Sequence, residues 1–200
     1  MALSPLDHAI QSTCPTEIVP HVGELPPLAG HKRLLLASDG VYLDCANAAL
    51  QARVRLSALS LPYGATTPFL HLPHGPLPRA LLQQALAAAA ATPIEVAFGL
   101  QHDEDDGYVL IQPPVTSASR SHVSYEDALD DQRLIVDLHS HGQGRAFFSA
   151  TDDASDLARV GPYLAVVVGR ADTAPEIAVR LVCPPFLIPL SLDDLRPLFA

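Results

Sequence analysis

Two histidines, a serine and an aspartate near the middle of the chain have the types and spacing of a metal centre. The order is His139, one residue, His141, seven residues, Ser149, two residues and Asp152. On an extended strand alternate side chains share a face, so His139 and His141 project the same way with Cα atoms about 7 Å apart. An aspartate from the first turn of the next helix would complete three ligands and leave a fourth position for water, as catalytic zinc requires.

The chemistry of such a centre would be hydrolysis. Zinc accepts mixed nitrogen and oxygen ligands, and it lowers the pKa of a coordinated water from about 15.7 to roughly 7. A proton acceptor is then needed nearby. A His-x-His pair alone is usually incidental, because ordinary hydrogen bonds can satisfy both rings. The added spacing to Ser149 and Asp152 favours the metal site instead.

These residues resemble the signature of the JAMM family of zinc metalloproteases, whose domain is also named JAB or MPN. The matching positions are His139, Ser140, His141, Ser149 and Asp152. The resemblance covers residues 76–190 and implies Zn²⁺ bound by the two histidines and the aspartate. It also implies a JAB/MPN-like (cytidine deaminase-like) three-layer α/β sandwich around a mixed β-sheet. One departure is Gly142, where eukaryotic relatives commonly carry proline, so the local loop is expected to differ.

The family pairs this signature with an upstream glutamate at the start of a strand, which acts first as general base and then as general acid. Glu95 matches, because it follows an alanine-rich segment and precedes the apolar residues 96–100. Glu104, in an acidic turn, and Glu126, in an expected loop, fit less well. The resemblance further implies that Ser149 stabilises the tetrahedral oxyanion, where a hydrogen-bond donor is worth about 2.7–4 kcal/mol.

The segments around the signature look like a narrower bacterial family, the PRTRC system protein A family. The matching stretches are 136–142, 146–153 and, nearer the N-terminus, 19–20, 23–24, 31–35 and 37–43. Genes of that cassette accompany ParB-related and ThiF-related proteins, and the latter resemble enzymes that activate the carboxyl termini of ubiquitin-like proteins. The implied substrate is a ubiquitin-like protein or its conjugate, cut at a peptide or isopeptide bond after the terminal glycine. A ThiF-like protein is the implied partner.

Composition argues against several other classes of protein. The chain has 200 residues, 48% of them hydrophobic, and a formal net charge of -10. It can therefore fold as a compact globule, and we expect binding neither to nucleic acid nor to an anionic membrane surface. We also expect neither secretion nor membrane spanning. Cys14, Cys45 and Cys183 are far apart in the sequence, which favours a reducing cytoplasm over disulfides or a thiolate zinc site.

Turn residues and apolar periodicity indicate the elements that would position the site. Residues 1–75 are expected to form an N-terminal accessory region, with an irregular proline-rich leader over 1–30. A β-hairpin is expected over 31–44, because Asp-Gly at 39–40 supplies a tight turn. Residues 46–60 fit either a short helix or a strand.

Residues 76–200 are expected to form the metalloprotease domain. Helices are expected at 78–91, 152–160 and 192–199. Strands are expected at 95–100, 108–112, 121–125, 134–138, 163–169, 176–183 and 186–190. This order indicates an α/β or α+β sandwich with one central mixed sheet and a small N-terminal β-containing extension.

Other polar residues receive structural interpretations. His71 and His74 flank a proline, which argues against a shared helical face for metal binding. Residues 102–107 are expected to be a charged hairpin tip, because the full calcium-binding pattern is absent. Asp153 suits the first turn of a helix, and Asp137 is expected to point away from the ligands. Cys183 is interpreted as a buried strand residue and not as a nucleophile.

Two alternatives to a protease for ubiquitin-like proteins remain open. A noncatalytic MPN-type scaffold would bind partners, although such relatives generally lack the metal ligands that this chain retains. A zinc hydrolase could instead act on another small amide or on a carrier protein. A measured absence of zinc would favour the scaffold, and neighbouring genes would discriminate between the substrates.

Overall fold

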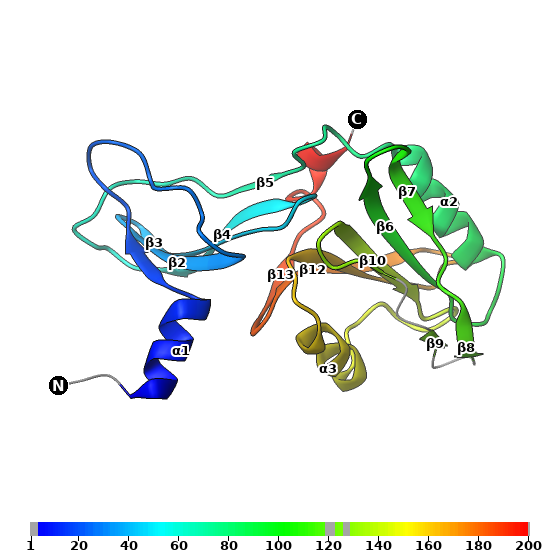
Figure 1. Ribbon diagram of the computed structural model, residues 1–200. Helices are drawn as coiled ribbons and strands as arrows, with labels where there is room; N and C mark the ends of the chain where they lie inside the picture. The colour runs from blue at the N-terminus through cyan, green and yellow to red at the C-terminus, as the bar shows by residue number, and fades with distance from the viewer. Residues whose placement is uncertain (1–3, 119–122, 126–128, 200) are drawn as a thin grey trace.

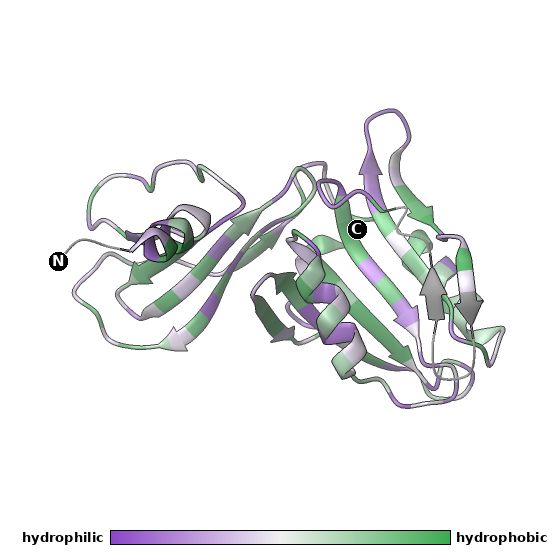
Figure 2. Cartoon of the chain, turned by 60° about the horizontal axis from the view of Figure 1, so that its bottom comes forward, coloured by the Kyte–Doolittle hydropathy of each residue, from purple (hydrophilic) through white to green (hydrophobic). Residues whose placement is uncertain are grey.

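The computed structural model describes residues 4–118, 123–125 and 129–199 (Figure 1). The strands form a five-stranded sheet near the N-terminus, a six-stranded sheet in the second part of the chain and a two-stranded hairpin. The two larger sheets lie side by side in both overall views (Figures 1 and 2). None of the helices in the described part of the chain has both the length and the apolar character needed to cross a lipid bilayer.

The five-stranded sheet has the order β1-β2-β3-β4-β5. Its strands are β1 (Thr16–Ile18), β2 (Lys32–Ala37), β3 (Gly40–Ala46), β4 (Gln51–Ala58) and β5 (Phe69–His71). β1 runs parallel to β2 and the other neighbours are antiparallel, so the sheet is mixed. The predicted hairpin is confirmed, because β2 and β3 pair across the turn at Asp39 and Gly40. The ambiguous segment from residue 46 to 60 contains a strand, β4, and no helix.

The leader is more regular than predicted. Residues Pro5–Thr13 form helix α1, so the expectation of an irregular leader is wrong for this stretch. Ser4 caps the helix: its Oγ accepts from the Asp7 N–H at 3.2 Å, and Asp7 Oδ2 accepts from the Ser4 N–H at 2.9 Å. Pro5 occupies the first turn, where the N–H that proline lacks has no helical partner in any case.

The six-stranded sheet has the order β13-β12-β11-β10-β6-β7. Its strands are β6 (Ala97–Asp103), β7 (Gly107–Ile111), β10 (Leu134–Ser140), β11 (Tyr163–Gly169), β12 (Glu176–Cys183) and β13 (Phe186–Leu190), and helices α2 (Arg79–Ala90) and α3 (Ala150–Ala158) accompany them. β10 and β11 are parallel and the other pairs are antiparallel. The predicted mixed sheet is therefore confirmed, and its central strands are mostly hydrophobic (Figure 2).

The two helices cover opposite faces of this sheet. Leu82 of α2 and Leu164 of β11 line the same apolar pocket on one face. Asp156 of α3 accepts a hydrogen bond from the hydroxyl of Tyr163, the residue before Leu164. Because neighbouring residues of a strand point to opposite faces, α2 and α3 lie on opposite sides. The chain thus forms the predicted three-layer sandwich.

One apolar core joins the two larger sheets. Leu43 of β3 belongs to the same buried cluster as Ile135 of β10. Beside this cluster, the Asn47 side-chain amide donates to the carbonyl oxygens of Leu134 and Pro162, at 3.0 and 2.9 Å. The N-terminal sheet is therefore fixed against the six-stranded sheet close to β10.

Some boundaries differ from the predicted ones. The strand expected from residue 95 begins at Ala97. An unpredicted strand, β8 (Val115–Ala118), pairs with β9 (Val123–Tyr125), and residues 121–122 of the strand expected there lie outside the described residues. The expected helix over 192–199 is reduced to a short 3-10 turn, Arg196–Leu198.

Candidate metal centre

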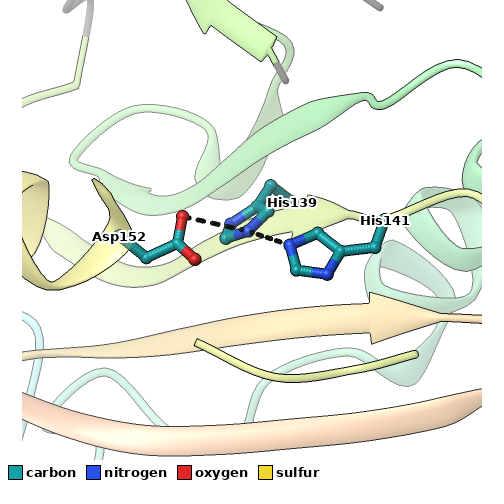
Figure 3. A group of neighbouring side chains, drawn as sticks. All are labelled: His139, His141 and Asp152. Atoms are coloured by element: carbon teal, nitrogen blue, oxygen red, sulfur yellow. Dashed lines mark hydrogen bonds and ion pairs between the residues drawn. The ribbon is translucent and has the colours of Figure 1, made fainter. Parts of the chain in front are cut away.

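Strand β10 holds the two histidines on one face, as predicted. His139 pairs with Ala97 of β6 and with Val167 of β11. His141 lies just past the end of β10, yet its N–H still donates to the carbonyl of Val168 at 2.8 Å. The sheet therefore fixes both backbone positions, and the Nε2 atoms of the two rings lie 3.3 Å apart (Figure 3).

Helix α3 contributes the carboxylate. Ser149 is its N-cap: Ser149 Oγ accepts from the Asp152 N–H at 3.2 Å, and Asp152 Oδ2 accepts from the Ser149 N–H at 2.6 Å. The other carboxylate oxygen of Asp152, Oδ1, lies 3.4 Å from Nε2 of His139. The Ser-x-x-Asp spacing therefore defines the start of the helix as well as the position of the carboxylate.

The three side chains form a group that could hold a metal ion (Figure 3). One ligand atom each from His139, His141 and Asp152 lies within 4.8 Å of the other two. Two imidazole nitrogens and one carboxylate oxygen are a donor set that suits zinc. The side chains of His139 and Asp152 remain 18% and 19% exposed, so the group is open to solvent on one side.

The hydrogen bonding of His141 and the pKa of His139 also suit a metal site. Nδ1 of His141 lies 3.0 Å from the carbonyl oxygen of Arg145, which can only accept, so we assign the proton to Nδ1. Nε2 then presents its lone pair to the group. Burial lowers the pKa of His139 to about 4, against the opposing effect of Asp152. His139 is therefore neutral at pH 7, as a metal ligand must be.

Glu95 lies immediately before β6 and is buried, with 6% of its surface exposed. Two residues later Ala97 pairs with His139. Between them Val96 and Ser140 exchange two hydrogen bonds: the Ser140 N–H donates to the Val96 carbonyl at 2.9 Å, and the Val96 N–H donates to Ser140 Oγ at 3.2 Å. These bonds hold the backbone of Glu95 beside the ligand strand, and its role in proton transfer stays a prediction.

Behind the group lies a buried ionic network that no local pattern in the sequence signals. Arg180 of β12 donates through Nε to Asp156 Oδ2 at 2.8 Å and through Nη1 to Asp153 Oδ1 at 2.5 Å. The Tyr163 hydroxyl donates to Asp156 Oδ1 at 2.7 Å. The sequence predicts only the acidic start of the helix, because Arg180 lies on a strand 24 residues after Asp156 and no spacing pattern links the two.

The expectation for Asp137 is wrong. Residues 137 and 139 are alternate positions of one strand and therefore share a face. Oδ2 of Asp137 lies 3.6 Å from Nε of Arg159, which ends α3. Asp137 thus helps to hold the far end of the helix that carries Asp152.

The structure explains why position 142 carries glycine where eukaryotic relatives in the family commonly carry proline. Its φ is +53°, and a Cβ at this position would lie 2.6 Å from the carbonyl oxygen of Pro93. Proline fixes φ at about −65° and could not adopt this conformation. The loop after the second histidine therefore requires glycine and brings the chain close to the segment that leads into Glu95.

Among the described residues, His71, His74, His102 and Cys183 lie outside the metal group. His74 and His102 stack with ring centroids 3.6 Å apart, while His71 lies on β5. Among the residues that the structure describes, none of these three histidines belongs to a set of three close metal-ligating side chains. Cys183 is 1% exposed on β12, which confirms its interpretation as a buried strand residue.

The acidic run is a charged hairpin tip, as predicted. Asp103 Oδ1 accepts from the N–H groups of Asp105 and Asp106 at 2.9 and 3.2 Å, and these two bonds lower the pKa of Asp103. Glu104 projects from the same turn, with 83% of its side chain exposed. Glu126, the other alternative to Glu95, lies outside the described residues.

Comparison with known families gives two adjacent matches. Residues 77–182, just over half of the chain, match the family described as prokaryotic homologs of the JAB domain. Residues 4–73 match a family described as a domain of unknown function, DUF2016. None of the curated proteins matches the chain. The first match includes Glu95 and every residue of the metal group.

Proposed function

The chain belongs to the family of prokaryotic homologs of the JAB domain, and on that premise we propose that it is a zinc-dependent peptidase. Its proposed substrate is a peptide or isopeptide bond at the carboxyl terminus of a ubiquitin-like protein. The observation that carries the proposal is the convergence of His139, His141 and Asp152, whose ligand atoms lie within 4.8 Å of one another.

His139, His141 and Asp152 would hold the zinc ion. His139 and His141 would each bind through Nε2 and Asp152 through Oδ1. A site with three protein ligands keeps one position for water or substrate, as catalytic zinc sites do. When bound, the ion would activate water and polarise the scissile carbonyl.

Glu95 is the proposed proton carrier. Its carboxylate would accept a proton from the attacking water and later deliver it to the leaving amine. Two observations support this role: the residue is 6% exposed, and it lies two positions before Ala97, which pairs with His139. A carboxylate buried next to the ligand strand would be shielded from bulk water, which would favour proton transfer to the substrate over exchange with solvent.

Ser149 is the proposed oxyanion donor. Its Oγ already accepts from the N–H of Asp152, so its own hydroxyl hydrogen is available to donate. The residue sits at the N-terminus of α3, where the helix dipole favours negative charge. A hydroxyl in this position can therefore stabilise an oxyanion that forms beside the metal group.

A groove next to the helix start provides space for an extended substrate. Its walls include Phe148, Asp153, Ala178, Leu187 and Pro189, from the segment before α3, from α3 and from β12 and β13. The mostly apolar walls suit the side chains of a protein tail. The ubiquitin-like nature of that tail is supported by the resemblance of residues 136–142 and 37–43 to the PRTRC family, in which a ThiF-like protein is the expected partner.

The proposal is tested with the ubiquitin-like protein encoded in the same gene neighbourhood, fused to a carboxyl-terminal extension. Incubation with the zinc-loaded full chain and intact-mass analysis should show cleavage after the terminal glycine. A chelator should abolish the cleavage and added zinc should restore it. Cleavage of small amides alone would redirect the proposal to another substrate. Absence of any hydrolysis by the folded, zinc-loaded chain would favour the noncatalytic scaffold.

A further inference from the structure

Helix α3 is held on the sheet by charge and not by apolar packing. Its alanines are exposed, Leu157 is 45% exposed, and the only buried residue of this fully described helix is Asp156. Asp152 and Asp153, one turn earlier, are half-buried. A surface helix normally turns an apolar stripe toward the core. α3 instead turns an acidic face toward the sheet, below which it lies in Figure 1.

Arg180 of β12 is the cation that meets this face. It is 5% exposed, and its Nη2 and Nε lie 2.6 and 2.8 Å from Oδ2 of Asp156. Its Nη1 lies 2.5 Å from Oδ1 of Asp153. The guanidinium carbon lies 3.9 Å from the ring centroid of Phe148, in the segment that leads into α3. Arg180 therefore contacts the helix at two of its turns as well as the chain that enters it.

Arg180 contacts only part of this acidic face. Asp152, Asp153 and Asp156 are three acidic side chains on α3, and Arg180 pairs with Asp153 and Asp156. Carboxylates that lie this close in a partly buried site repel one another unless cations compensate them. A divalent cation held by Asp152 would lower the repulsion among these side chains. The acidic face of α3 is therefore complementary to Arg180 and a divalent ion together.

We propose that Arg180 is a positioning residue for Asp152, and that docking of α3 is thermodynamically coupled to the binding of a divalent cation by His139, His141 and Asp152. The inference rests on the metal centre of the proposed function and is independent of the substrate. Coupling of this kind is reciprocal. The free energy by which a docked α3 strengthens metal binding equals the free energy by which bound metal stabilises the docked helix.

Zinc affinity tests the proposal directly. Zinc binding by the full chain is measured in competition with a chromogenic chelator for the wild type and for Arg180→Met. We expect the variant to bind zinc about 10–100-fold more weakly, the usual effect of losing a group that orients a metal ligand. Arg33→Met is the matched control, because Arg33 is 3% exposed and pairs with Glu17 and Asp44 in the N-terminal sheet. Its zinc affinity should equal that of the wild type.

Hydrogen exchange gives a readout that separates positioning from general stability. In the wild type, zinc should slow exchange of the amides of residues 150–158, and this protection should require higher zinc concentrations in Arg180→Met. Two milder variants keep the test valid if Arg180→Met does not fold. Asp153→Asn removes one contact at a side chain that is 48% exposed, and Arg180→Lys keeps the charge without the two-sided contact. Both should weaken zinc binding to an intermediate degree.

Two results would overturn the inference. One is equal zinc affinity in the wild type and the folded Arg180 and Asp153 variants. The other is exchange of the α3 amides that zinc leaves unchanged. A folded wild type that binds no zinc would instead contradict the metal centre itself, so the two failures are distinguishable.

Discussion

Oδ1 of Asp152 lies 3.4 Å from Nε2 of His139, although the two residues belong to different elements. β10 fixes His139 in the interior of the six-stranded sheet, with strands paired on both sides. α3 supplies Asp152 and is attached to that sheet through a few charged side chains. The positions of the two histidines are therefore fixed by the sheet, whereas the position of Asp152 depends on residues outside the motif that hold α3 in place.

Replacing Glu95 by glutamine should separate catalysis from metal binding. Glutamine keeps the size of the side chain but cannot accept a proton, so we expect a rate loss of about 10²–10⁴-fold. Zinc affinity should stay near the wild-type value, because the proposed ligands are His139, His141 and Asp152. The cleavage rate and the zinc content are measured on the same preparation. Glu104→Gln, at the exposed hairpin tip, is the control, and undiminished hydrolysis by Glu95→Gln would refute the assignment.

Ser149→Ala should cost activity beyond the loss of a helix cap. The cap itself is worth about 1 kcal/mol of stability, and loss of an oxyanion donor should slow hydrolysis by about 10²–10³-fold. Ser4→Ala is the matched control, because Ser4 forms the same type of capping box at α1. Thermal unfolding and cleavage rates of both variants distinguish the roles. If Ser149→Ala is as active as Ser4→Ala, Ser149 has a capping role only.

Gly142→Ala should disturb the site more than another glycine of positive φ. Alanine at 142 combines a left-handed φ with a contact of 2.6 Å to the Pro93 carbonyl, two residues before Glu95. Gly107→Ala, with φ +72° and nothing within 4 Å, carries the backbone strain of about 1–2 kcal/mol alone. Gly142→Ala should lower both the unfolding free energy and the cleavage rate more than Gly107→Ala does. Equal losses in the two variants would mean that the backbone near Pro93 can move away from the added Cβ without affecting stability or activity.

Asn47→Ala should weaken the junction between the two larger sheets. The side-chain amide donates to the carbonyls of Leu134 and Pro162, and Oδ1 accepts from the N–H groups of Ala49 and Leu50 at 2.8 and 2.7 Å. Buried groups left without a partner cost about 1–3 kcal/mol each, so denaturant unfolding should show a clear loss of stability. Gln143→Ala, an exposed amide side chain, should change stability by less than about 0.5 kcal/mol. Similar values for the two variants would argue against a structural role for Asn47.

Local chemistry explains which elements the sequence predicts well. The hairpin at residues 31–44 depends on an Asp-Gly turn, and β10 depends on a continuous apolar run, so both have short-range signals. The two histidines and Asp152 were also predictable, because alternation on a strand and the first turn of a helix fix their directions. The sequence does not predict helix α1, because the prolines of the leader favour irregular structure, whereas in the structure Pro5 lies in the first turn, where proline is tolerated.

Long-range contacts explain the rest. Arg180 meets Asp153 and Asp156 only because β12 packs under α3, and no spacing in the sequence encodes that pairing. Alternation along β10 places Asp137 and His139 on one face, contrary to the expectation for Asp137. The burial of Glu95 likewise depends on pairing between β6 and β10, which are separated by β7 and the β8–β9 hairpin.

The zinc content of the purified full chain tests the central claim most directly. Elemental analysis after mild purification should give about one zinc ion per chain for the wild type, as a single catalytic site requires. The double variant His139→Ala, His141→Ala should contain almost none while keeping its fold by circular dichroism. A folded wild type that neither retains nor takes up zinc, or a double variant that binds zinc as well as the wild type, would contradict the account.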